Sequence, residues 1–245
     1  MVPLILHIPH SSLKIPDYSN FILSKNEVDA EAIRMSDLYT DELFEGKSED
    51  YKIQADFCRI FCDVERFDDD AQEPMSKFGM GVTYLKCDDG RGLRILNADQ
   101  KDFVLKQYYY KHHKNLEQAV VEQLEANGEV RIIDCHSFPD KPFQCSFYQG
   151  PEKFDFNIGT DDFHTPPEWV DLAVRYFKDL GFKLGINEPY AGSLVPMSFY
   201  QKNNKVKSIM LEINRKLYMN DDFSKNSNFI NTKNIVENFL NLYRS

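Results

Sequence analysis

The chain of 245 residues is 42% hydrophobic and 13% aromatic, and this length suits one large core in a single domain spanning residues 1–245. Its formal net charge of −10 disfavours nucleic acid and anionic membrane surfaces as partners, because both are bound through basic faces. Its five cysteines form no C-x-x-C pair, and no signal-peptide pattern or run of about eighteen apolar residues is present, so we expect a cytoplasmic protein with reduced thiols.

The first half of the chain alternates between apolar runs and segments of helical periodicity. The elements predicted there are, in order, a buried strand at 3–9, a helix at about 27–45, strands at 51–57 and 58–67, and loops at 68–80 and 88–92. The longest helix follows at 98–128, with Asp99 as its predicted N-cap and Gly128 as its stop.

The second half continues the alternation of strands and helices. The elements predicted there are strands at 129–135 and 145–149, a helix from the paired prolines 166 and 167 to about Gly181, strands at 182–187 and 206–214, and a helix at 229–244. This order predicts an α/β fold in one domain, with a mixed, mostly parallel sheet and helices on both of its faces.

Reactive residues gather where the predicted strands end. His10 follows the first strand, Asp63 and Arg66 end the CRIFCDVER stretch, His136 ends the strand that begins at 129, and Glu212 lies near the end of SIMLEIN. The carboxyl ends of parallel strands share one edge of a sheet, so these side chains can meet in one crevice. Two histidines, a carboxylate ligand and a separate carboxylate are the parts of a hydrolytic zinc centre, although no H-E-x-x-H motif is present.

Several motifs, taken in order, resemble the N-formylglutamate amidohydrolase family. They are HIPHSS, SDLYTDEL, CRIFCDVER, IIDCHSF, NIGT, INEPYAGS and IMLEINRKLYM, and they span residues 5–219. The resemblance implies a zinc-carboxypeptidase-like (phosphorylase/hydrolase-like) fold, because that family is related to the zinc carboxypeptidases and to aspartoacylase. The D-x-H-S strand end and the late L-E-I-N strand are its most specific elements.

The resemblance implies one Zn²⁺ ion held by His10 and His136. In the carboxypeptidases a glutamate three residues after the first histidine completes the ligand set, but Leu13 occupies that position here. We therefore expect Asp37, in the Asp-rich stretch that the amidohydrolases share, to be the third ligand. The alternatives are Asp63 and Asp134. His7 is expected to be structural, because on a strand it would point away from His10.

Arg59 and Arg66 lie in a stretch that resembles the family pattern S-R-x-x-x-D-x-N-R, in which arginine binds a substrate carboxylate. A guanidinium group suits this role because it meets both carboxylate oxygens in one plane. Glu65 stands where the pattern has asparagine, which places a negative charge beside the expected anion pocket. The alternative role for Arg66 is a salt bridge with one of the acids at 68–70.

Three further residues are expected to contact the substrate. His113, in the long helix, matches a family histidine, and its alternative is a place in the helix packing or surface. Asn187 and Tyr190, in NEPYAGS, are expected in a loop that closes over the substrate, although Pro and Gly alone would indicate only a turn.

These residues predict a zinc-dependent hydrolase with Glu212 as its general base. The expected substrate is a small anionic N-acyl amino acid such as N-formyl-L-glutamate, whose amide bond is cleaved by activated water. Two alternatives stay open. One is a zinc carboxypeptidase that acts on peptides, and the other is a non-catalytic binding protein that keeps the fold without the metal.

Overall fold

The computed structural model describes residues 2–146, 150 and 153–244, and in these the strands form one sheet in the order β2-β1-β3-β6-β4-β5. The strands are β1 (Ile5–Ile8), β2 (Tyr51–Gln54), β3 (Val130–Phe138), β4 (Phe156–Gly159), β5 (Leu184–Ile186) and β6 (Val206–Asn214). β1, β2, β3 and β6 run parallel, β4 is antiparallel to β6, and β5 is parallel to β4. The predicted α/β fold with a mixed, mostly parallel sheet is confirmed.

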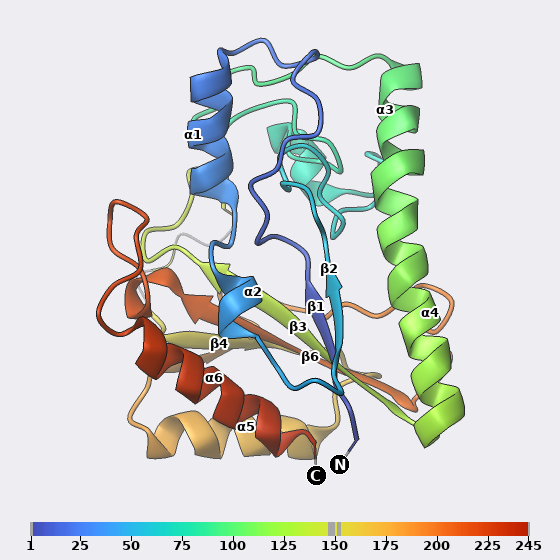
Figure 1. Ribbon diagram of the computed structural model, residues 1–245, viewed down its shortest axis with the longest axis vertical. Coiled ribbons are helices and arrows are strands. Elements are labelled where there is room, and N and C mark those ends of the chain that lie inside the picture. Colours follow the sequence, from blue (N-terminus) through green and yellow to red (C-terminus); the bar gives the residue numbers. More distant parts are fainter. Residues whose placement is uncertain (1, 147–149, 151–152, 245) are drawn as a thin grey trace.

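Helices cover both faces of the sheet (Figure 1). The helices are α1 (Lys25–Met35), α2 (Thr40–Leu43), α3 (Ala98–Val104), α4 (Tyr110–Asn127), α5 (Pro167–Asp179) and α6 (Phe229–Leu242), with short 3₁₀ turns at Pro74–Phe78 and Arg215–Leu217. α2, α5 and α6 pack on one face, and α4 packs on the other. Coverage of both faces explains why β3 and β6 are buried at nearly every position rather than at alternate ones.

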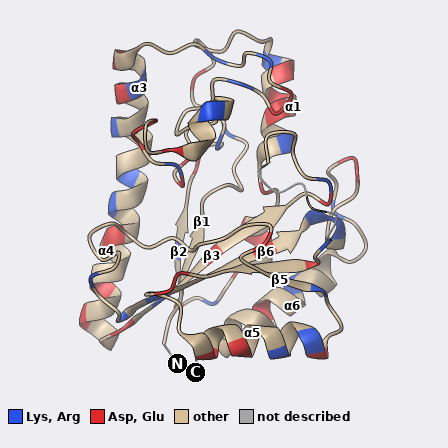
Figure 2. Cartoon of the chain, turned by 180° about the vertical axis from the view of Figure 1, so that it is seen from behind, with Lys and Arg blue, Asp and Glu red and all other residues tan. Residues whose placement is uncertain are grey.

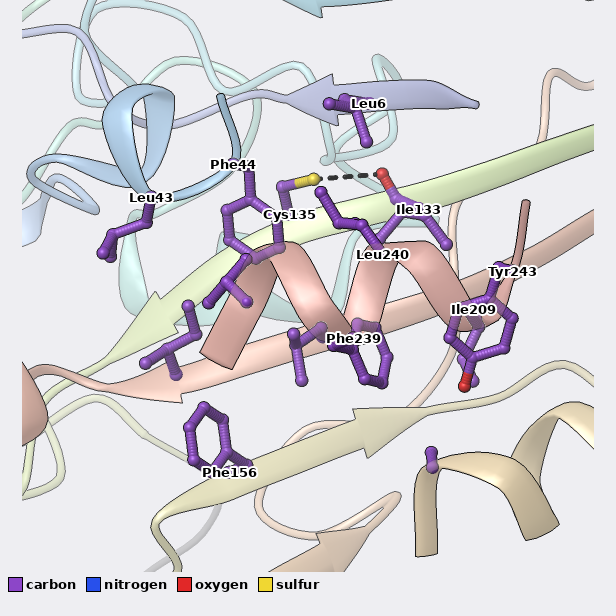
Figure 3. Close-up of a cluster of buried hydrophobic side chains, with 14 of the residues drawn as sticks. Leu6, Leu43, Phe44, Ile133, Cys135, Phe156, Ile209, Phe239, Leu240 and Tyr243 are labelled. Atoms are coloured by element: carbon purple, nitrogen blue, oxygen red, sulfur yellow. Dashed lines mark hydrogen bonds between the residues drawn. The ribbon is translucent and has the colours of Figure 1, made fainter. Parts of the chain in front are cut away.

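Figure 3 shows the larger of these two cores. Leu43 and Phe44 at the end of α2, together with Phe239 and Leu240 of α6, pack over Cys135 of β3. All of these side chains are fully buried, and each large apolar one contributes about 1.5–3 kcal/mol of transfer free energy. This core holds β3 and β6 firmly at the edge where the reactive residues lie.

A further apolar cluster lies beyond the carboxyl ends of β1 and β2, between α1 and α3 (Figure 1). The strand predicted at 58–67 is wrong, because this stretch forms successive turns inside the cluster. Phe61 and Cys62 both donate backbone hydrogen bonds to the Cys58 carbonyl, and Glu65 donates its backbone N–H to the Asp63 side chain. The apolar residues from Cys58 to Val64 are buried, but in turns rather than in the sheet.

The helix predicted at 27–45 is two helices. α1 begins after Ser24, whose side chain forms a capping box with Glu27, and it ends at Met35. The backbone N–H of Asp37 then donates to the His10 carbonyl at 2.9 Å, and Tyr39 adopts a left-handed conformation with φ 68° before α2 begins. The break places Asp37 beside the first strand instead of on a helix.

The helix predicted at 98–128 is also interrupted. Its N-cap is Asn97 rather than Asp99, and the predicted end at Gly128 is confirmed by that residue's φ of 74°. Between α3 and α4 the segment Leu105–Tyr109 is a π-helix, a local widening that often occurs near functional sites. The Tyr109 hydroxyl donates to the carbonyl of Arg66 at 2.8 Å, so this widened turn supports the segment that carries the predicted arginines.

The remaining predictions were mostly confirmed. The strands predicted at 3–9, 129–135, 182–187 and 206–214 and the helices after 166 and at 229–244 are present within a few residues. β4 was missed, and of the strand predicted at 145–149, residues 145 and 146 are not extended strand and 147–149 lie outside the described residues.

Charged residues lie along the helices, whereas the cysteines lie in the interior. Basic and acidic residues both lie along α3, α4 and α5 (Figure 2). All five cysteines are buried and free. No helix among the described residues is both long and apolar enough to cross a membrane.

Candidate functional site

A cavity of about 590 Å³ opens at the carboxyl ends of β1, β3 and β6. This is the sheet edge at which parallel strands bring distant parts of a sequence together. Of the predicted site residues, the cavity is lined by His10, Asp37, Arg59, Arg66, His136, Tyr190 and Glu212. Its size suits a small molecule rather than a folded protein segment.

His10 and His136 lie side by side at this cavity, with their ring centroids 5.2 Å apart. Nε2 of His10 lies 2.8 Å from Oδ1 of Asp63, which fixes the orientation of the ring. Nδ1 of His10 is buried and has no hydrogen-bond partner among the described residues. A buried polar atom without a hydrogen-bond partner lowers the stability of the folded protein by about 1–3 kcal/mol. A ligand bound at this nitrogen would remove that cost.

Asp37 supplies a carboxylate beside both histidines. Its Oδ2 lies 3.3 Å from Nδ1 of His136 and 3.7 Å from Nδ1 of His10. Its Oδ1 accepts a hydrogen bond from Nη2 of Arg215 at 3.0 Å, and its Oδ2 accepts one from the backbone N–H of Ser137 at 3.2 Å. Burial opposes ionisation, yet the neighbouring imidazoles of His10 and His136 and the charge of Arg59 hold the pKa of Asp37 well below its usual value.

Glu65 is a second carboxylate at this place, and the sequence did not predict it as a ligand. Its Oε1 lies 3.1 Å from Nε2 of His136, and its Oε2 lies 4.0 Å from Nδ1 of His10. Ligand atoms of His10, Glu65 and His136 all lie within 4.8 Å of one another, as a metal site requires. Asp37 therefore lies beside Nδ1 of His136, and Glu65 lies beside Nε2. The only signal in the sequence was an acid where the family pattern has asparagine.

His7 belongs to a buried network behind the cavity wall. Its Nδ1 lies 2.8 Å from Oδ1 of Asp134, and its Nε2 lies 2.8 Å from Nε2 of His112. The same Asp134 oxygen lies 3.2 Å from Nε2 of His136. Burial lowers the pKa of His112 to about 2. Burial also opposes charge on His136, but the negative charges of Glu65 and Asp134 raise its pKa well above the usual value.

Glu212 lies next to His136, because the two residues are paired in the register of β3 and β6. Its side chain is nearly fully buried, and its Oε2 has no hydrogen-bond partner among the described residues. Burial raises the pKa of Glu212 to about 8. A buried carboxyl group with a raised pKa at the wall of a cavity is typical of a general acid or base.

Arg59 and Arg66 border the cavity in different ways. Arg59 donates through Nε and Nη2 to Oδ2 of Asp63, at 3.2 and 3.0 Å, and the Tyr84 hydroxyl donates to the same oxygen. Burial opposes ionisation of Asp63, but His10, Arg59 and Arg66 hold its pKa well below the usual value. Nε of Arg66 lies 3.8 Å from Oδ2 of Asp63 and has no hydrogen-bond partner among the described residues. Nε of Arg66 can therefore donate to a bound ligand, whereas Nε and Nη2 of Arg59 already donate to Asp63.

The structure does not bring His113 and Asn187 to the cavity wall, unlike Tyr190. Nε2 of His113 lies 2.8 Å from the carbonyl oxygen of Val64, so the ring holds the backbone beside Glu65. Asn187 accepts from the backbone N–H of Thr160 at 2.8 Å and donates to its hydroxyl at 2.7 Å, which makes it a loop-fixing residue.

The family model for N-formylglutamate amidohydrolase matches residues 2–219. A crystal structure of N-formylglutamate amidohydrolase from Ralstonia eutropha JMP134 is similar, with a TM-score of 0.84 and 24% identity over 97% of this chain and 91% of that chain. The structure of a gene product from Agrobacterium tumefaciens has a TM-score of 0.65 and 16% identity, over 100% and 92% of the two chains. No curated protein sequence gives a significant match. At these identities the two structures establish the shared fold.

Proposed function

The chain belongs to the N-formylglutamate amidohydrolase family, and we propose that it is a metal-dependent hydrolase that cleaves the amide bond of a small N-acyl amino acid. The observation that carries this proposal is that two buried atoms at one cavity have no hydrogen-bond partner among the described residues. They are Nδ1 of His10, on the metal-ligand side, and Oε2 of Glu212, on the acid/base side.

Ligand atoms of His10, Glu65 and His136 lie close enough together for a metal ion. Oδ2 of Asp37 lies 3.3 Å from Nδ1 of His136 and 3.7 Å from Nδ1 of His10. We propose that Nδ1 of His10, Nδ1 of His136 and Oδ2 of Asp37 hold a zinc ion, because two imidazoles and one carboxylate form a typical catalytic zinc site with an open position. Asp63, an alternative ligand from the sequence, is already engaged with Nε2 of His10. When bound, the ion would acidify a water molecule and polarise the scissile carbonyl.

Glu212 is the proposed general base. It removes a proton from the attacking water and donates that proton to the leaving nitrogen, which is the double role of a positioned acid/base group. The partner-free oxygen of Glu212 and its raised pKa support this role. A nearby positive charge shifts such a carboxyl group back toward the ionised form that a base requires.

Arg66 is the proposed recognition group for the substrate carboxylate. It lines the cavity, and its Nε has no hydrogen-bond partner among the described residues. Arg59 neutralises Asp63 and lies 3.6 Å from Asp37, so we assign it to the support of the ligands and to the developing negative charge. Tyr190, on a neighbouring loop, completes the wall. An anionic N-acyl amino acid such as N-formyl-L-glutamate fits this distribution of charge.

The test is a substrate comparison on zinc-loaded protein. N-formyl-L-glutamate, other N-acyl amino acids and a peptide with a free C-terminus are offered, and release of the amine is measured. We expect zinc-dependent cleavage of at least one N-acyl amino acid. Cleavage of the peptide alone would instead show a carboxypeptidase. Less than about a tenth of an equivalent of zinc, with no activity restored by added metal, would show a binding protein.

A further inference from the structure

A second group of ligand atoms lies directly behind the first. His7, Glu65 and Asp134 offer a ring nitrogen and two carboxylate oxygens that all lie within 4.8 Å of one another. We infer that these three residues bind a second divalent transition-metal ion, with Glu65 shared between it and the ion proposed at His10 and His136. The inference deepens the proposed function. The pairing of two ions rests on the metal site proposed there, whereas binding of the second ion does not.

The distances suit coordination. Nδ1 of His7 lies 2.8 Å from Oδ1 of Asp134 and 3.5 Å from Oε1 of Glu65. Two ligand atoms that each lie about 2.0–2.2 Å from a tetrahedral zinc ion are about 3.3–3.6 Å apart. The separation of His7 from Glu65 fits this value, and the hydrogen bond between His7 and Asp134 would lengthen by about 0.5 Å when the ion binds. His7 and Asp134 are almost completely buried, and Glu65 reaches them from the cavity. One imidazole and two carboxylates suit Zn²⁺ or Mn²⁺.

Glu65 has the geometry of a bridging carboxylate. Its Oε1 faces Nδ1 of His7 at 3.5 Å, whereas its Oε2 faces Nδ1 of His10 at 4.0 Å. Oε1 also lies 3.1 Å from Nε2 of His136, so Glu65 contacts ligand atoms of both groups. In two-metal hydrolases the ions lie about 3.5–4 Å apart, a separation that one carboxylate group spans.

The surroundings of the second group are those of ordered ligands. A metal-bound imidazole usually donates its other N–H to a nearby acceptor, and Nε2 of His112 lies 2.8 Å from Nε2 of His7. Oδ2 of Asp134 accepts the backbone N–H of Leu194 at 3.0 Å, which leaves Oδ1 toward His7. His112 and Leu194 thus hold two of the three ligands from behind.

Charge at the cavity wall favours more than one cation. Among the described residues, the wall carries three arginines, Arg59, Arg66 and Arg215, against five carboxyl side chains, Asp37, Glu65, Glu73, Asp134 and Glu212. Buried carboxylates need partners, and an anionic substrate would add to the negative charge. The ion proposed at the first site would offset the excess of two carboxyl groups, and a second ion would offset the charge of an anionic substrate on the side where Glu65 and Asp134 lie.

Metal stoichiometry tests the inference without an activity assay. Metal-free protein is titrated with Zn²⁺ by calorimetry, and bound metal is counted after dialysis. We expect two equivalents for the parent protein and one for His7→Asn, whose amide can still donate to Asp134 but is a poor ligand. His164→Asn is the matched control, because His164 is equally buried, but its ring hydrogen-bonds to the Val206 and Gln201 backbone, packs against Phe163 and Tyr200, and does not line the cavity. It should keep two equivalents.

Electron paramagnetic resonance of Mn²⁺-loaded protein tests the sharing of Glu65. A coupled pair of ions in the parent, replaced by an isolated ion in Glu65→Gln, would support the bridge. One equivalent in the parent, unchanged by His7→Asn, would overturn the second site and leave the proposed hydrolase intact. No bound metal in any variant would remove both proposals. Melting temperatures confirm that each variant is folded.

Discussion

His136 and Glu212 are register partners on the adjacent parallel strands β3 and β6. Neighbouring strands lie about 4.8 Å apart, and paired residues point to the same side of a sheet. The proposed ligand and the proposed base are therefore set at a fixed separation by backbone hydrogen bonds rather than by a loop. Sites built on strands are more precise than sites built on loops.

The first prediction concerns the metal. We expect His136→Ala to lose the ion of the first site and all turnover while the protein stays folded, because one ligand matters more to the site than to the large core of β3. Metal content, circular dichroism and turnover are measured on one preparation. His164→Ala serves as the control, and full zinc and turnover in His136→Ala would remove His136 from the centre.

The second prediction separates the two candidate carboxylate ligands. Asp37→Asn keeps the size of the side chain and can still accept from Arg215, but it removes the negative charge beside both Nδ1 atoms. We expect zinc affinity at the first site to fall by about tenfold or more. Glu65→Gln should lower that affinity less than Asp37→Asn does, because Glu65 is the proposed bridge between the two ions and Asp37 belongs to the first site alone. The reverse order, measured by competition with a chelator, would make Glu65 the ligand.

Residues that end long apolar runs could be identified from the sequence. His10, His136 and Glu212 each follow or end a strand buried on both faces, so their place at the sheet edge follows from the pattern. Their assignment as ligands and base needed the family resemblance. A strand-end histidine alone is more often a buried hydrogen-bonded residue than a metal ligand.

The network behind the cavity could not be predicted, because its members meet only in three dimensions. His7 and His112 are 105 residues apart, and Glu65 reaches the site through turns in a stretch predicted as a strand. β4 was missed for a similar reason, since its four residues include Asn157 and Gly159 and its place depends on pairing with β6. Asp37 was predicted as a ligand through the resemblance, and the single helix predicted to carry it is two helices.

The third prediction concerns substrate recognition. A hydrogen bond to a charged group contributes about 1.5–3 kcal/mol, so Arg66→Met should raise KM for an anionic N-acyl amino acid by about 10- to 100-fold with little change in kcat. The control is Arg91→Met, an exposed arginine paired with Asp89 and Glu27. An equal loss on two analogues, one with the side-chain carboxylate and the other with the α-carboxylate replaced by an amide, would show that Arg66 binds neither carboxylate.

The fourth prediction concerns metal removal. An ion that binds only the folded protein stabilises it by about 4 kcal/mol at a thousandfold excess over its dissociation constant. For a chain of this size that corresponds to a change in Tm of about 10 °C. Chelation should therefore lower Tm and abolish turnover together, and added Zn²⁺ should restore both. A Tm that is unchanged by chelation in protein shown to contain metal would contradict the buried ligand set.

The last prediction separates chemistry from metal binding. Glu212→Gln keeps the size of the side chain but removes the base, so kcat should fall by about 10²-fold or more while the first ion stays bound. Because burial raises the pKa of Glu212 to about 8 and its Oε2 has no hydrogen-bond partner among the described residues, a neutral amide should not lower Tm. A structural glutamate would behave differently, since its replacement would lower Tm and leave the rate per bound metal unchanged.

The matched control is Glu129→Gln, which removes the same charge just before β3, at the opposite end of that strand, where Glu129 pairs with Arg131 and Lys207. That variant should lose some stability and keep its turnover per bound metal. Metal content, Tm and turnover are measured for both variants on a substrate that the parent protein cleaves. Normal turnover per metal in Glu212→Gln would exclude Glu212 as the base, and the paired residue His136 would then be a ligand at a site whose proton acceptor lies elsewhere.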